Sequence, residues 1–191
     1  MTRLARQFFN RSTLVVAREL LGTRLVHEAE GQRVAGVILE TEAYIGEEDD
    51  ACHARAGLTD RTAPLYGPPG HAYVYLNYGI HWLFNCVTEA PGCPAAVLIR
   101  ALRPVEGRAK IRLRRQGRNE GEWMDGPGKL TQALGVDKRH NGLDLCDPHS
   151  RLFIEPGTPV PDSGVTTTSR VGLNKVIEPW KSVPWRFVIG T

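Results

Sequence analysis

Two acids and a tyrosine occupy alternate positions at the end of a strand-like segment: Glu40, Glu42 and Tyr44. The apolar residues 34–39 come directly before them, which predicts that they close a β-strand. Because successive side chains of a strand point to opposite sides, all three would share one face. A carboxylate beside an aromatic ring could act there as a general base. A solvated strand end is the alternative interpretation.

A single charge, Arg100, interrupts the apolar segment 95–102, which is otherwise typical of a strand. A charge within such a segment is costly unless it is paired. Glu42 or Glu40 on another strand end is a natural partner. A purely structural ion pair and an arginine on an edge strand are the alternatives.

Three tyrosines lie on and just beyond the predicted strand 72–76. Tyr73 and Tyr75 share a face, where aromatic residues most often belong to the core. Tyr78 differs, because the Asn-Tyr-Gly sequence at 77–79 predicts a reversal before the next strand, 80–87. An exposed aromatic residue at a hairpin tip is a candidate wedge between nucleic-acid bases. His53 follows the acidic residues 47–50 and, taken alone, is typical of a surface histidine.

Basic residues are mostly arginine, with 19 Arg and 5 Lys in a chain of net charge +3. Arginine presents a planar fork that suits phosphate groups. Seven basic residues fall within 103–118, where they could contact nucleic acid or simply form a solvated helix face. The candidates for contact with a DNA backbone are Arg108, Arg112, Arg115 and Lys129.

Length and composition favour an ordinary globular chain. Its 191 residues suit one domain, 1–191, and no apolar run reaches the ~18 residues that a membrane span needs. No apolar segment follows Arg3 and Arg6, so a secretory signal is not expected. The four cysteines are scattered and form no C-x-x-C pair, which argues against structural zinc and dense disulfides. We therefore expect an intracellular, reduced protein. The sequence shows no obvious self-association surface, so a monomer is expected.

The predicted elements indicate an α+β domain with a mainly antiparallel sheet and a protruding hairpin. Gly46 to Gly70 predicts a long ordered loop, a feature that is often functional. Ser12 is the predicted N-cap of the first helix. Helices are predicted at 13–21, 104–115 and 129–134. Strands are predicted at 24–27, 32–42, 72–76, 80–87, 95–102, 152–154 and 185–189.

Together these residues supply what the removal of a base from DNA requires. The base must first leave the stack, at a cost of a few kcal/mol. A wedge can fill the gap, and aromatic rings can return roughly 1–3 kcal/mol for each stacked base. A carboxylate can then activate water against the sugar carbon, as in the hydrolysis of sugars.

The chain resembles the alkyladenine (3-methyladenine, methylpurine) DNA glycosylase family over almost its whole length. Several separate sequence blocks in one order make this more specific than any single motif. The markers are Glu-Thr-Glu-Ala-Tyr-Ile-Gly at 40–46, Asp-Ala-Cys-His at 50–53, Tyr-Val-Tyr-Leu-Asn-Tyr-Gly at 73–79, Asn85, Leu-Ile-Arg-Ala-Leu at 98–102, Gly-Pro-Gly-Lys-Leu at 126–130 and Arg-Val-Gly at 170–172.

The resemblance implies a fold and a chemistry. The fold would be one mixed domain with a curved antiparallel sheet and surrounding helices. Glu42 matches the general base that deprotonates the attacking water, and Arg100 matches the arginine beside that water. Tyr78 matches the residue inserted into the duplex. The activity would be monofunctional, cutting the N-glycosidic bond of damaged purines in double-stranded DNA to leave an abasic site, with neither metal nor cofactor.

The resemblance also implies a pocket for the flipped base. Tyr44 and Tyr75 match its aromatic walls, and His53 matches a stacking and hydrogen-bonding wall. Asn85 matches the residue that obstructs the 2-amino group of normal guanine. The Ile-His pair at 80–81 stands where mammalian members carry methionine and tyrosine, so the substrate range can differ from theirs.

Three other functions fit parts of the sequence. The protein could bind damaged DNA without cutting it, which only an activity assay distinguishes. It could bind RNA, in which case it would prefer RNA to a lesion duplex. It could instead be a metal-dependent hydrolase, whose activity EDTA would remove, with ligands from Glu40, Glu42, Asp49, Asp50 and His53.

Overall fold

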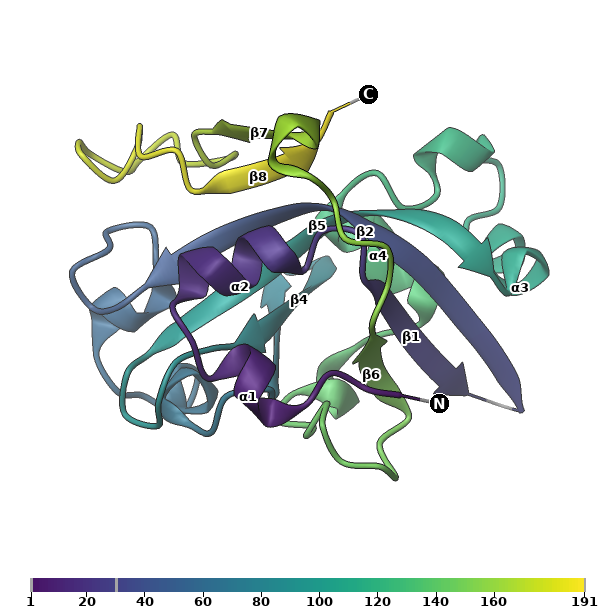
Figure 1. Ribbon diagram of the computed structural model, residues 1–191, viewed down its shortest axis with the longest axis horizontal. Coiled ribbons are helices and arrows are strands. Elements are labelled where there is room, and N and C mark those ends of the chain that lie inside the picture. The colour runs from purple at the N-terminus through teal and green to yellow at the C-terminus, as the bar shows by residue number, and fades with distance from the viewer. Residues whose placement is uncertain (1, 30, 191) are drawn as a thin grey trace.

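An eight-stranded sheet organises the computed structural model, which describes residues 2–29 and 31–190 (Figure 1). Strands pair in the order β3-β4-β5-β2-β1-β6, while β8 pairs with both β2 and β7. Every pairing between these strands is antiparallel, which confirms the predicted α+β class. The strands are β1 (Arg24–Ala29), β2 (Gln32–Ile45), β3 (Ala72–Asn77), β4 (His81–Val87), β5 (Ala95–Glu106), β6 (Leu152–Glu155), β7 (Val165–Thr168) and β8 (Arg186–Ile189).

The long strand β2 carries the acids and links the two ends of the sheet. On one edge it pairs with β5 along most of its length. On the other edge it pairs first with β1, up to Val37, and then with β8 at Glu40, Thr41 and Glu42. Its register with β5 shifts on both sides of Glu40. The acidic end of β2 therefore lies between β5 and β8.

Short α-helices pack around the sheet in the described part of the chain: α1 (Arg6–Phe9), α2 (Thr13–Glu19), α3 (Arg108–Arg114) and α4 (Pro127–Leu134). Helix α2 lies against β2, where the Thr41 hydroxyl donates to the carbonyl of Ala17 at 2.8 Å (Figure 1). Ser12 occupies the predicted N-cap position, but its side chain makes no capping bond. The Glu89 carboxylate instead accepts from the backbone N–H of Thr13.

The helix predicted at 104–115 begins too early. Residues as far as Glu106 belong to β5, where Pro104 lies opposite Gly36 of β2. Gly107 then adopts a left-handed conformation, with φ of 71°, and α3 begins at Arg108. Pairing with β2 thus decides the conformation of a segment whose local sequence favours a helix start.

The predicted hairpin is confirmed as β3 and β4. Its turn places Tyr78 and Gly79 at positive φ, 49° and 71°. Glycine adopts this conformation freely and a tyrosine rarely does. Tyr78 is 85% exposed at the tip, and Ile80 beside it is 71% exposed.

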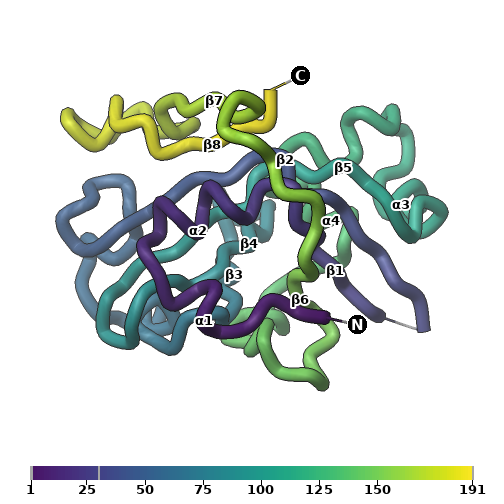
Figure 2. The backbone as a smooth tube through the Cα atoms, viewed as in Figure 1, coloured from purple at the N-terminus to yellow at the C-terminus, as the bar shows by residue number. Residues whose placement is uncertain are grey.

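Two irregular segments lie at the same end of the sheet. The predicted loop 46–70 contains two short 3₁₀ turns, η1 (His53–Ala56) and η2 (Ala63–Tyr66). Its residues Cys52, Ala54 and Leu65 form a small core with Tyr73. The second segment, 169–185, joins β7 to β8, and both segments lie on the left in Figure 2.

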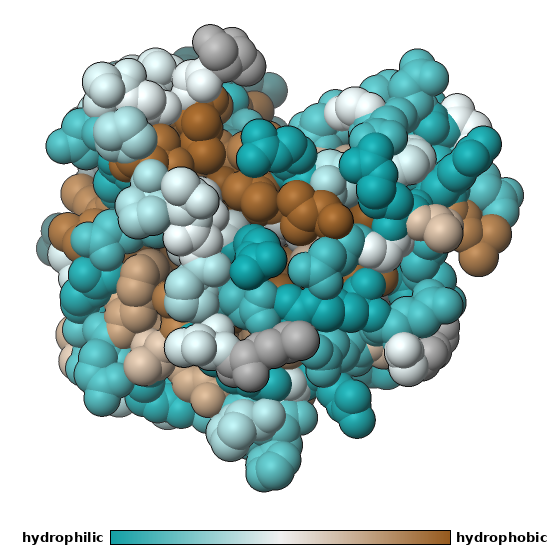
Figure 3. All heavy atoms as spheres, turned by 45° about the vertical axis from the view of Figure 1, so that its right-hand side comes forward, coloured by the Kyte–Doolittle hydropathy of each residue, from teal (hydrophilic) through white to brown (hydrophobic). Residues whose placement is uncertain are grey.

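The surface is mostly hydrophilic on the face shown in Figure 3, where a narrow band of hydrophobic residues crosses it. Scattered exposed apolar residues are normal for a protein surface in water. Across residues 2–29 and 31–190, each helix falls short of the length and apolar character needed to cross a membrane.

Candidate active site

A cavity of about 350 Å³ opens at the end of the sheet, between β2–β5, the loop 46–70 and the segment 169–173. This volume lies within the range of small-molecule sites. The loop 46–70 and the segment 169–173 form the two walls of the cavity that do not come from strands. Its lining includes Tyr44, Cys52, His53, Tyr73, Tyr75, Tyr78, Asn85, Arg100, Val171 and Gly172.

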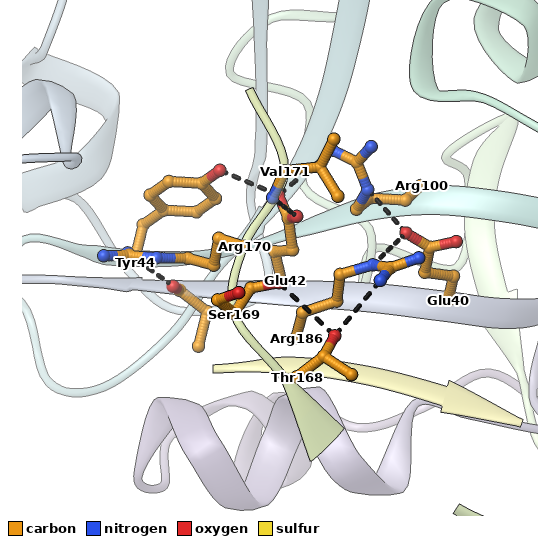
Figure 4. Close-up of polar contacts among 10 residues, drawn as sticks. Glu40, Glu42, Tyr44, Arg100, Thr168, Ser169, Arg170, Val171 and Arg186 are labelled. Carbon is orange, nitrogen blue, oxygen red and sulfur yellow. Dashed lines mark hydrogen bonds and ion pairs between the residues drawn. The ribbon is translucent and has the colours of Figure 1, made fainter. Parts of the chain in front are cut away.

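Glu42 lies behind this lining and is completely buried. Its Oε2 accepts from the Tyr44 hydroxyl at 2.8 Å and from Nη1 of Arg100 at 3.1 Å. Its Oε1 accepts from the backbone N–H of Val171 at 2.6 Å (Figure 4). Because a carboxylate has about four acceptor positions, three donors leave room for one more. All three donor residues also line the cavity.

Burial raises the pKa of Glu42 above its ordinary value. The Arg100 charge, the Val171 N–H and the Tyr44 hydroxyl act in the opposite direction, because each stabilises the ionised carboxylate. A carboxylate whose pKa is raised accepts a proton more readily, which suits a general base.

Arg100 connects the two acids, as the sequence predicts. Its Nε donates to Glu40 at 2.6 Å, and its Nη1 reaches Glu42. Glu40 has a second cationic partner, because Nε of Arg186 on β8 also donates to it at 2.6 Å (Figure 4). Hydrogen bonds from the two arginines lower the pKa of Glu40 against the effect of burial. Glu40 is therefore a fixed anion, whereas Glu42 is the acid with raised proton affinity.

Aromatic rings form the walls of the cavity. The rings of His53 and Tyr75 lie 4.4 Å apart between centroids, and those of Tyr73 and Tyr75 lie 5.3 Å apart. Nδ1 of His53 bonds the Tyr73 hydroxyl at 2.9 Å. Burial and the nearby Arg61 charge lower the pKa of His53 to about 4, so its ring is neutral near pH 7. A neutral ring offers one donor and one acceptor to a base.

Asn85 lies on β4 at the edge of the cavity and is almost fully buried. Its Nδ2 donates to the carbonyl of Tyr73 at 3.0 Å. Because a carbonyl only accepts, this bond fixes which end of the amide faces β3. The structure thus brings Tyr44, His53, Tyr75, Asn85 and Arg100 together around one cavity.

Three charged contributors had no role assigned from the sequence: Arg170, Arg186 and Asp49 in its observed pairing. The Arg170 side chain forms a fully buried ion pair with Asp49. Arg-Val-Gly at 170–172 is one of the family markers, and this is the only signal in the sequence that points to it. The burial of Arg170 and its pairing with Asp49 both depend on the folding together of segments about 120 residues apart.

The basic residues proposed for the DNA backbone differ in their surroundings. Arg112 is exposed on α3, while Arg108 and Lys129 form exposed ion pairs with Glu120 and Asp125. Arg115 is nearly buried, and its guanidinium donates to the Gln132 side chain and the Glu122 carbonyl. An arginine held in this way is poorly placed to reach a phosphate.

Arginine side chains already pair with acids of the metal-site alternative. Glu40 bonds Arg100 and Arg186, and Asp49 bonds Arg170. Within the described part of the chain, no group of three or more His, Cys, Asp or Glu side chains is arranged to hold a metal ion.

The chain is similar to known proteins over nearly its whole length. The family profile described as methylpurine-DNA glycosylase matches residues 7–191. A Myxococcus xanthus protein is 50% identical over 97% of this chain and 89% of its own length. A Carboxydothermus hydrogenoformans protein is 47% identical over 97% and 94%, and both bear the provisional name 3-methyladenine DNA glycosylase. The chain therefore belongs to the methylpurine-DNA glycosylase family, whose reaction is the hydrolysis of N-glycosyl bonds in the repair of damaged DNA.

Proposed function

We propose that this protein, acting as a monomer, flips damaged purines out of duplex DNA and hydrolyses their N-glycosidic bond with an activated water. The observation that carries this proposal is the buried Glu42 carboxylate, held by three donors that all line an aromatic cavity. Glu42 is the general base, and the water occupies its remaining acceptor position. Arg100 orients the water and the carboxylate together.

The flipped base occupies the cavity, stacked between Tyr44, Tyr75 and the neutral ring of His53. Stacking of this kind returns roughly 1–3 kcal/mol for each base, which offsets the cost of unstacking. Asn85 restricts the edge of the base that a normal guanine would present. N3- and N7-alkylated purines are cationic and leave without acid assistance. They are therefore the expected main substrates, whereas hypoxanthine and ethenoadenine would need protonation as they leave.

The reaction is monofunctional in this proposal, because water and not a lysine attacks the sugar. Incubation with duplex DNA containing 7-methylguanine should release the free base and leave an intact strand that breaks only in alkali. Strand cleavage without alkali would contradict a monofunctional reaction. Tight binding of the lesion duplex with no release would favour the non-cutting DNA-binding alternative. Preferential binding of RNA would favour an RNA-binding domain.

Tyr78 is the proposed wedge, because this residue is 85% exposed at the tip of a hairpin that borders the cavity. Tyr78→Ala should weaken binding of the lesion duplex by about tenfold or more, the equivalent of one lost stacking contact. Equilibrium binding and single-turnover excision would measure this. Val15→Ala, which trims an exposed apolar side chain on α2, is the control. If Tyr78→Ala and wild type bind the lesion duplex with equal affinity, Tyr78 is not the wedge.

Arg108, Arg112 and Lys129 remain the proposed phosphate contacts, and Arg115 is omitted because it is nearly buried. The affinity for DNA falls as salt rises. In Arg112→Gln the steepness of log affinity against log salt should decrease by about 1, as expected for one lost phosphate contact. The measurement is a salt titration of binding to undamaged duplex DNA. A slope equal to that of wild type would place Arg112 outside the interface.

A further inference from the structure

A second buried ion pair lies beside Glu42 and has no part in the proposed chemistry. The side chains of Arg170 and Asp49 are both fully buried. Nη1 and Nη2 of Arg170 donate to the two carboxylate oxygens at 2.5 and 2.8 Å. A buried ion pair often stabilises a protein no more than apolar residues of the same size would. Its position therefore suggests a role beyond stability.

The pair holds three parts of the chain together. Asp49 also accepts from the backbone N–H groups of Ile45 and Ala51, which fixes the turn after β2. Arg170 donates to the carbonyls of Ala43 and Trp180, each at 3.0 Å. It thereby joins the end of β2, the loop 46–70 and the C-terminal segment 169–185.

Arg170 also controls the surroundings of Glu42 from two sides. Its guanidinium lies 4.7 Å from the centre of the Tyr44 ring, whose hydroxyl donates to Glu42. Its neighbour in the chain is Val171, whose N–H donates to Glu42 at 2.6 Å (Figure 4). Two of the three hydrogen bonds to Glu42 therefore come from residues that Arg170 holds in place.

We infer that Arg170, held by Asp49, is a positioning residue that fixes the Val171 N–H and the Tyr44 hydroxyl on Glu42 and so sets the proton affinity of the general base. This inference rests on the proposed function of Glu42. Its consequence is a dependence on pH, because weaker hydrogen bonds to the ionised carboxylate raise its pKa. The other titratable or charged groups around Glu42 are Glu40, Tyr44, Tyr75, Arg100 and Arg186.

Two variants test the inference. Arg170→Lys keeps the charge but loses the planar fork, which supplies four of the observed bonds. The double variant Asp49→Asn/Arg170→Met removes both charges, so neither is left buried alone. Asparagine at position 49 keeps one acceptor oxygen, so one of the two N–H bonds from Ile45 and Ala51 can be retained.

Single-turnover release of 7-methylguanine would be measured from pH 5 to pH 9. Because the active base is the ionised form, the rate falls on the acidic side of its pKa. In both variants this acidic limb should move to higher pH, with a loss of about tenfold at low pH, as for one lost hydrogen bond to a charged group. The rates should approach the wild-type rate at high pH.

A purely structural role predicts a different result, since a partly unfolded sample loses the same fraction of activity at every pH. A uniform loss, or an unchanged profile in both variants, would overturn the inference. The matched control is Arg33→Met/Glu155→Gln, which removes a largely buried ion pair at the far end of β2. Its profile should keep the wild-type midpoint.

A second readout separates this inference from the proposed function. Carbon-13 NMR of the Glu42 side-chain carboxyl reports its pKa whether or not the protein releases a base. The pKa should be higher in both Arg170 variants than in wild type. If wild type releases no base but the pKa still rises, the proposed reaction fails and the positioning role stands. An unchanged pKa refutes the positioning role.

Discussion

Glu42→Gln should slow base release by about 10²–10⁴-fold, the usual contribution of a general base. Glutamine keeps the size of the side chain and can still accept from the Val171 N–H. Its amide cannot accept a proton from water, so the attacking water is no longer activated. The cavity walls stay in place, and affinity for the lesion duplex should remain close to that of wild type. Single-turnover kinetics and equilibrium binding would measure the two quantities separately.

Glu40→Gln is the matched control, because Glu40 lies two residues earlier on β2 and shares Arg100. Its carboxylate is already held by two arginines, and its pKa is lowered, so it is a poor base. The loss of rate should be much smaller than for Glu42→Gln. If Glu40→Gln has the larger effect, the assignment of the base must be exchanged between the two acids.

Arg100→Met should have the largest effect on stability, since it leaves the buried Glu42 carboxylate without the one cationic side chain that contacts it among residues 2–29 and 31–190. Breaking a buried ion pair from one side typically costs about 3–5 kcal/mol of unfolding free energy. Base release should also fall at neutral pH, because Arg100 is the strongest of the groups that lower the pKa of Glu42. Urea denaturation and single-turnover kinetics would measure both effects.

The stability loss in Arg100→Met should grow with pH. Burial already places the folded pKa of Glu42 above its ordinary 4.5, and removing Arg100 raises it further. Between 4.5 and the folded pKa, only the folded state retains the proton, so stability falls as pH rises through this window. The variant should therefore lose more stability at pH 8 than at pH 5.

Arg186→Met provides the comparison, because Arg186 pairs with Glu40 and makes no ion pair with Glu42. The pKa of Glu40 is lowered in wild type, and in this variant Arg100 still donates to Glu40 and favours its ionised form. The stability cost should accordingly be similar at the two pH values. Equal losses at pH 5 and pH 8 in Arg100→Met as well would contradict a raised pKa for Glu42.

Local patterns in the sequence predict the strands and the hairpin well. The apolar segment 34–39 and the Asn-Tyr-Gly turn at 77–79 are local signals, and both elements form where expected. The start of α3 could not be predicted, because residues 104–106 follow their pairing with β2 and not their own propensity. The short strand β7 depends in the same way on pairing with β8.

The residues of the site also differ in how far local sequence patterns predict them. The period of a strand is enough to place Glu40, Glu42 and Tyr44 on one face, and a charge among apolar residues is enough to expect a partner for Arg100. The partners on the C-terminal segment are different. Arg170 and Asp49 meet across about 120 residues, and the Val171 donor is a backbone group that no side-chain pattern reveals.

The environment of Glu42 combines opposing effects. Burial alone would leave the carboxyl protonated over a wide pH range and unable to accept a proton from water. Donors from Arg100, Tyr44 and Val171 favour the ionised form and keep it in one orientation. In the proposed mechanism, these donors keep the buried carboxylate able to accept a proton from the attacking water.

The most direct test of this mechanism is the release of 3-methyladenine or 7-methylguanine from alkylated duplex DNA in EDTA, by wild type and Glu42→Gln in parallel. The mechanism predicts release by wild type, with release by Glu42→Gln lower by at least about 100-fold despite similar DNA binding. Equal release by both proteins would remove Glu42 from the chemistry. Loss of wild-type release in EDTA would show that the reaction requires a metal ion.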